Sequence, residues 1–105
     1  LFGNETAEKI LLSIENYGSG YPRGIATNFG MAISQVQRQL ERLEREAVLS
    51  SRLVGRTRVY EFNPRYLFRD ELKALLKKAL KNLPDEILEK DFTQRTRPRR
   101  RGKPL

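Results

Sequence analysis

The chain contains no cysteine and no histidine among its 105 residues. Without cysteine there is no disulfide framework and no thiolate metal site, and without histidine the commonest general base and zinc ligand is missing too. No apolar run approaches the ~18 residues that a membrane-spanning helix requires. The first residues also lack the basic region of a signal peptide. We therefore expect a cytoplasmic protein that binds no metal, no cofactor and no membrane.

The carboxylates offer no catalytic arrangement. They lie among arginine and lysine at helical spacing, as in Glu41 and Glu44 and again in Asp85, Glu86 and Glu89, which favours solvated ion pairs. The sequence has no glycine-rich phosphate loop, nucleophile elbow or metal-ligand cluster. We therefore expect a protein that is not an enzyme.

The positive charge is concentrated at one end of the chain. The net charge is +8, and residues 93–105 supply six basic side chains and no acidic one. The preceding 92 residues hold 15 basic and 13 acidic side chains and are nearly balanced. We predict a disordered tail that makes non-specific contacts with a phosphate backbone, and the alternative is a merely solubilising end. The basic residues of the tail are Arg95, Arg97, Arg99, Arg100, Arg101 and Lys103.

Apolar residues at spacings of three and four predict four helices. The first runs to about Tyr17, and a break rich in turn residues follows. The second covers 22–29 and ends at Gly30, because glycine tolerates the left-handed conformation of a sharp turn. The third covers 33–47, and the fourth covers 70–83. A fifth, short helix that reaches Phe92 is predicted separately, because Pro84 suits a first helical position and Asp85 and Glu86 suit a helix N-terminus. The third helix has one continuous apolar stripe, composed of Ile33, Val36, Leu40, Leu43 and Ala47.

Between the third and fourth helices, β-favouring residues flank Gly55 and predict a hairpin over 50–62. Helix, turn, helix and then a hairpin with a cationic tip is the order of a winged helix-turn-helix, which offers DNA a helix for the major groove and a wing beside it. The predicted fold class is therefore mainly α with a small β-hairpin, a C-terminal helix and a basic disordered tail.

Two sets of polar residues are candidates for DNA contact. Arginine can bind guanine and glutamine can bind adenine through two hydrogen bonds, and a cationic hairpin tip can reach phosphates or a narrow minor groove. The alternatives are an ordinary solvated helix face and charges that protect a sheet edge from aggregation. The recognition-helix set is Ser34, Gln35, Gln37, Arg38 and Arg42, and the wing set is Arg52, Arg56, Thr57 and Arg58.

The fourth helix carries an apolar stripe that is wide for a small domain. Large exposed apolar surface usually marks a partner, so we predict a homodimer interface there, with core packing against the first helix as the alternative. The predicted organisation is a DNA-binding domain over 1–68, a helical dimerisation region over 69–92 and the tail over 93–105. The stripe consists of Leu72, Leu75, Leu76, Ala79, Leu80 and Leu83.

The residues also resemble a known family. The segments 30–36 and 40–49, followed by Gly55-Arg56 and Val59-Tyr60, are similar to winged-helix regulators of the ArsR-like and MarR-like type from bacteria and archaea. In those proteins a pattern like L-x-R-L-E-x-x-G-[LV] closes the recognition helix, and a G-R-x-x-x-Y pattern forms the wing. The opening 1–4 resembles their lead into the first helix, so the similarity covers roughly residues 1–83.

The resemblance implies a dimeric prokaryotic transcriptional regulator that binds double-stranded DNA. It does not indicate which small molecule, if any, controls the regulator. Two positions depart from the pattern. Ala32 is a poor N-cap, which allows the third helix to start one residue away, and Ala47 replaces the usual glycine and should tighten the helix exit. The metal-sensing branch uses cysteine and histidine ligands that this chain lacks. The alternatives to DNA binding are a protein-interaction module and an RNA-binding accessory protein that uses the arginine-rich tail.

Overall fold

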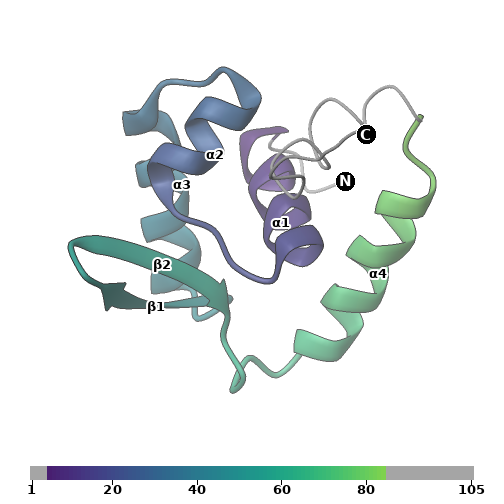
Figure 1. Ribbon diagram of the computed structural model, residues 1–105. Coiled ribbons are helices and arrows are strands. Elements are labelled where there is room, and N and C mark those ends of the chain that lie inside the picture. The colour runs from purple at the N-terminus through teal and green to yellow at the C-terminus, as the bar shows by residue number, and fades with distance from the viewer. Residues whose placement is uncertain (1–4, 85–105) are drawn as a thin grey trace, which may run out of the picture.

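The computed structural model describes residues 5–84, and residues 1–4 and 85–105 lie outside that description. The described part is mainly helical with one two-stranded antiparallel hairpin (Figure 1). Its elements are α1 (Glu5–Tyr17), α2 (Pro22–Phe29), α3 (Ile33–Arg45), β1 (Leu49–Val54), β2 (Thr57–Phe62) and α4 (Arg69–Lys81). The predicted order of four helices and a hairpin is confirmed. The predicted helix reaching Phe92 and the basic tail lie outside the described residues.

The core forms around α1, which lies between α3 and the hairpin on one side and α4 on the other (Figure 1). Ile10 and Ile14 of α1 are fully buried, as are Leu40 of α3 and Leu76 of α4. Burial on α1 extends beyond the predicted face because the helix has neighbours on more than one side. Within residues 5–84, no helix combines the length and apolar character needed to cross a membrane.

The turn between α2 and α3 is sharp because of Gly30. This residue has a φ of 67°, and the Met31 N–H donates to the Ala26 carbonyl at 2.9 Å, which satisfies an open carbonyl at the helix end. The predicted left-handed glycine is therefore confirmed. α3 then begins at Ile33 with Ala32 as its N-cap, so its start is not shifted, and no side chain caps it.

The exit from α3 departs from the prediction. The helix ends at Arg45, two residues before the predicted Ala47, which has a φ of 66° and lies outside the helix. The Ala47 N–H donates to the Glu44 carbonyl at 2.9 Å, and the Val48 N–H donates to the Leu43 carbonyl at 3.0 Å. This is the pairing in which a left-handed residue, usually glycine, closes a helix. Alanine supports it here at a conformational cost of about 1–2 kcal/mol.

The hairpin has regular register, from Leu49 opposite Phe62 to Val54 opposite Thr57. A second attachment comes from the loop before α2, where Gly20 and Tyr60 exchange backbone hydrogen bonds of 2.9 and 2.7 Å. Glycine fits there because a Cβ on residue 20 would lie 2.9 Å from the Cδ1 atom of Ile25. The hairpin is thereby held to the start of α2, a link that the sequence did not predict.

The apolar stripe of α4 lies against the core. Leu76 and Leu80 are buried, and Leu72, Ala79 and Leu83 are partly buried against the same cluster, while Leu75 is 44% exposed. This is the core packing that the sequence left as the alternative. The stripe is therefore not a free apolar surface that needs a partner. Such a surface was the main reason for predicting a dimer.

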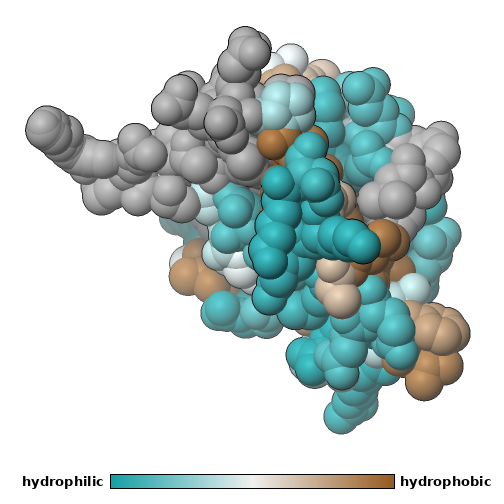
Figure 2. Space-filling model, turned by 90° about the vertical axis from the view of Figure 1, so that its right-hand side faces the viewer, coloured by the Kyte–Doolittle hydropathy of each residue, from teal (hydrophilic) through white to brown (hydrophobic). Residues whose placement is uncertain are grey.

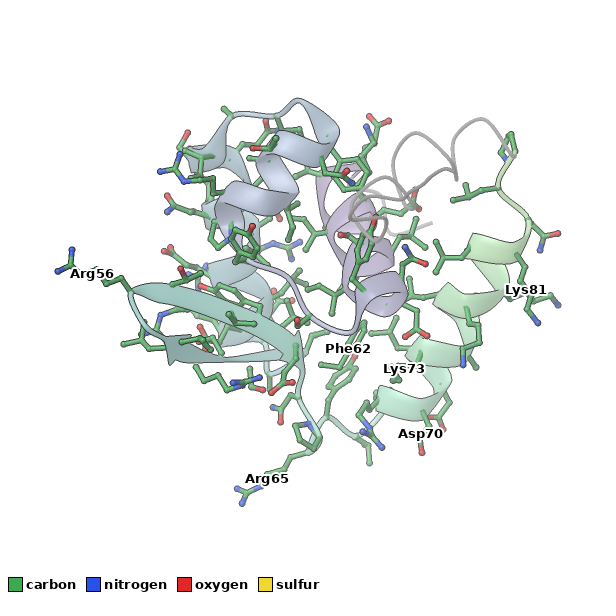
Figure 3. The ribbon with its side chains drawn as sticks, viewed as in Figure 1. Arg56, Phe62, Arg65, Asp70, Lys73 and Lys81 are labelled. Carbon is green, nitrogen blue, oxygen red and sulfur yellow. The ribbon has the colours of Figure 1, made fainter. Side chains whose placement is uncertain are left out.

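A polar contact also ties α4 to α1. Lys73 Nζ lies 2.9 Å from the Glu15 carboxylate, whose side chain is only 5% exposed, and 4.9 Å from the centroid of the Phe62 ring (Figure 3). A carboxylate this buried needs a partner, because an unpaired buried charge is costly. Lys73 is therefore part of the fold, whereas Lys77, Lys78 and Lys81 on the same helix are exposed. The face of the molecule on the α4 side is mostly hydrophilic (Figure 2).

Candidate nucleic-acid interface

A groove of about 300 Å³ forms where three segments meet. The start of α2, the first turns of α3 and the hairpin tip each supply lining residues. The bridge between Gly20 and Tyr60 fixes the first and third of these relative to each other. The groove is lined by Tyr21, Pro22, Arg23, Ile33, Gln37, Arg56, Thr57 and Arg58.

Several cations in or near the groove and along α3 have no counterion within residues 5–84. Arg23 and Arg56 line the groove, and Arg38 and Arg45 are exposed on α3. None of the four forms an ion pair or side-chain hydrogen bond with another described residue. Figure 3 shows Arg56 projecting from the hairpin tip away from the body of the molecule. These guanidinium groups are available to an anionic ligand.

A hydrogen-bonded chain connects the hairpin to α3. Arg58 Nη1 donates to Ser51 Oγ at 2.9 Å, and Ser51 Oγ donates to the Glu44 carboxylate at 2.7 Å. Arg58 and Ser51 are on neighbouring strands, and Glu44 is on the last turn of α3. The chain holds Arg58 on the side of the hairpin that faces α3 and leaves its other guanidinium N–H groups for a ligand.

The predicted wing residues do not all face the same way. Arg56, Thr57 and Arg58 line the groove, but Arg52 forms an ion pair with Glu61 at 3.6 Å instead. Successive side chains of a strand point to opposite faces, and Leu49, on the face opposite Arg52, is the buried one. Arg52 therefore lies on the side of the hairpin away from α3.

The predicted α3 residues divide in the same way. Gln37 lines the groove, whereas Gln35 donates to Thr6 Oγ1 of α1 at 3.0 Å. Arg42 donates to Gln39 at 3.1 Å and pairs with Glu46 at 3.4 Å. At about 100° per residue, Gln35 and Arg42 lie roughly 180–200° around the helix from Ile33, and Gln37 only about 40°. Ser34 and Arg38 are exposed between these two directions.

Four groove residues were not among the predicted site residues: Tyr21, Pro22, Arg23 and Ile33. Ile33 was assigned to the buried stripe, but it is 38% exposed at the first position of α3. The other three belong to the start of α2, and only the non-local bridge from Gly20 to Tyr60 brings that segment to the hairpin. Pro22 indicates from the sequence where α2 begins, but nothing in the sequence indicates that it lines a groove.

Tyr60 lies buried beneath this surface, and its phenol has a pKa raised above 10.0. Burial is the main cause, since it disfavours the phenolate, and the Glu44 and Glu41 carboxylates raise the pKa further while Arg58 lowers it. The phenol is therefore neutral at physiological pH and packs as an apolar group with a polar tip.

This raised pKa predicts a loss of stability in alkali. Above pH 10 the unfolded phenol ionises before the folded one, so the unfolded state binds fewer protons and the free energy of unfolding falls as pH rises. Tyr60 contributes up to about 1.4 kcal/mol per pH unit in that window. Urea unfolding of the native chain and of Tyr60→Phe from pH 8 to 11 should show a shallower alkaline decline in the variant. Parallel profiles would contradict the assignment.

The described residues include no group of three or more acidic, histidine or cysteine side chains placed to hold a metal ion. The tail residues predicted to contact phosphate, 95–103, lie outside the described part. Comparison with protein-family models, with curated proteins and with solved structures finds no match to this chain. The geometry of the groove and its chemistry must therefore support any functional assignment.

Proposed function

We propose that the protein is a winged helix-turn-helix factor that binds double-stranded DNA sequence-specifically, with α3 in the major groove and the hairpin as the wing. The observation that supports this most is the convergence of Arg23, Gln37 and the hairpin tip on one groove. Cations bind phosphates and fix the register of a protein on the duplex, while an amide side chain on a helix can read a base edge. The groove combines both kinds of group.

The dimensions fit this role. α3 has 13 residues and is therefore about 20 Å long at 1.5 Å per residue. A major groove about 12 Å wide admits such a helix. The helix still packs on its own domain, because Val36, Leu40 and Leu43 are buried along the stripe that adjoins the groove residues. The resemblance to ArsR-like and MarR-like regulators implies that the outcome of binding is control of transcription.

The groove cations should contribute affinity for every duplex. Replacing Arg23 and Arg56 together with alanine should weaken binding to a random duplex about tenfold at roughly 0.1 M salt, because two phosphate contacts are lost. The slope of log affinity against log salt should become shallower by about 2, at ~0.9 per contact. Fluorescence anisotropy with a labelled duplex at several salt concentrations measures both quantities.

The matched control removes the same charge elsewhere. Arg65 and Lys81 are exposed and project from other parts of the molecule than the hairpin tip (Figure 3). The Arg65→Ala, Lys81→Ala protein should therefore retain native affinity and salt slope. Equal losses in both double variants would show that only net charge matters. Failure of the native protein to bind duplex DNA would favour a protein-interaction module, and preferential binding of structured RNA would favour the RNA alternative.

A further inference from the structure

Ile33 is an unusual residue for its position. It is an aliphatic side chain at the first position of α3, it is 38% exposed, and it lines the groove instead of the core. Gln37 follows one helical turn later and lines the same groove. Residues four apart lie one above the other on a helix, so the two side chains share one face. An apolar group and an amide group are thus presented together.

The pair lies in a groove that also carries three arginines, Arg23, Arg56 and Arg58. Pro22 and Tyr21 extend the apolar surface beside Ile33, and Arg56 and Arg58 line the hairpin side. A ligand that fits must bring an apolar group to Ile33 and a hydrogen-bonding edge to Gln37, with negative charge beside the arginines. Nucleotides in a duplex meet the last requirement through their phosphates.

Among the base pairs, A·T offers both an apolar group for Ile33 and a matching hydrogen-bonding edge for Gln37. Thymine carries a C5 methyl group in the major groove, and adenine presents an N7 acceptor beside an N6 donor, which matches a glutamine carboxamide. Guanine offers two acceptors there and cytosine offers a donor without a methyl group. An A·T pair therefore satisfies Ile33 and Gln37 together, and a G·C pair satisfies neither fully.

We infer that α3 reads a step containing A·T, with Ile33 against the methyl group of thymine and Gln37 on the edge of adenine. This inference rests on the proposed function. It assigns Ile33 as a specificity-determining residue of the interface, and it names the base group that the residue contacts.

Replacing thymine with deoxyuridine tests the contact directly, because the two bases differ only by the methyl group. A duplex site is first selected with the purified full chain, and each thymine is then replaced in turn. At one position the native protein should lose about fourfold in affinity, which corresponds to about 0.8 kcal/mol for one buried methyl group. Ile33→Ala should bind the thymine and deoxyuridine duplexes equally.

A matched variant guards against indirect effects. Leu53 is 62% exposed on the hairpin and does not line the groove, so Leu53→Ala should discriminate between the duplexes as the native protein does. Replacing the partner adenine with 7-deazaadenine removes N7, and this should weaken the native protein but not Gln37→Ala. Thermal unfolding of each variant confirms that the fold is intact.

The outcomes separate this inference from the function on which it rests. If the native chain selects no duplex at all, the proposed function fails. If it selects a duplex but does not distinguish thymine from deoxyuridine at any position, the Ile33 contact is overturned. Discrimination that persists in Ile33→Ala would overturn it equally, as would a selected site without an A·T pair.

Discussion

The Gln37→Ala, Arg38→Ala double variant should bind its selected duplex about a hundredfold more weakly than the native protein does. Each two-bond contact between a side chain and a base is worth about 1–3 kcal/mol. Gln37 lines the groove, and Arg38 is exposed on the adjoining face of α3. Affinity for random duplex should fall much less, because the phosphate contacts proposed for Arg23 and Arg56 are unchanged. Competition titrations with selected and random duplexes measure the ratio of the two affinities.

The control for this experiment uses the same residue types on the same helix. Gln35 and Arg42 were predicted to contact DNA as well, but Gln35 donates to Thr6, and Arg42 donates to Gln39 and pairs with Glu46. The Gln35→Ala, Arg42→Ala protein should therefore keep most of its preference for the selected duplex. If this control loses as much specificity as the Gln37→Ala, Arg38→Ala protein, α3 is oriented differently on DNA. If neither loses specificity, α3 is not the element that reads the bases.

Leu76→Ala should lower the free energy of unfolding by about 3 kcal/mol. Leu76 is fully buried where α4 packs on the core, and truncating a buried leucine removes its transfer free energy and leaves a cavity. For a small domain this is a large share of the total stability. Urea unfolding of the native chain and the variant measures the change, at two protein concentrations so that any contribution from association is visible.

The neighbouring Leu75 separates core packing from dimerisation. It is 44% exposed, so Leu75→Ala should cost well under 1 kcal/mol if the stripe serves the core. If the stripe instead served a dimer, Leu75→Ala would weaken association and make stability more dependent on protein concentration. Analytical ultracentrifugation of the native chain and both variants measures their oligomeric state directly. The dimer itself remains a prediction, because the packing of the described residues does not require one.

Local chemistry was enough to predict most of the elements. The order of helices follows from apolar spacing, and the turn at Gly30 follows from the conformational freedom of glycine. The end of α3 was placed too late because alanine rarely adopts the left-handed conformation that Ala47 has. A sequence pattern cannot show that tertiary packing overrides this preference.

The site was predicted only in part, for a different reason. Periodicity distinguishes buried positions from exposed ones, but it does not tell which exposed side chains meet a ligand. Gln35 and Arg52 are both exposed, yet one contacts α1 and the other pairs across the hairpin. The link between Gly20 and Tyr60 joins residues far apart in the chain, and it brings Arg23 to the groove without any local signal.

We propose that the groove face of α3, the start of α2 and the hairpin tip together bind duplex DNA. The most direct measurement is an NMR titration of the isotopically labelled full chain with its selected duplex. The largest amide shifts should fall on residues 21, 23–24, 33–38 and 55–58. Saturable binding whose shifts are confined to α4 or to the basic tail, with these three segments unchanged, would contradict it.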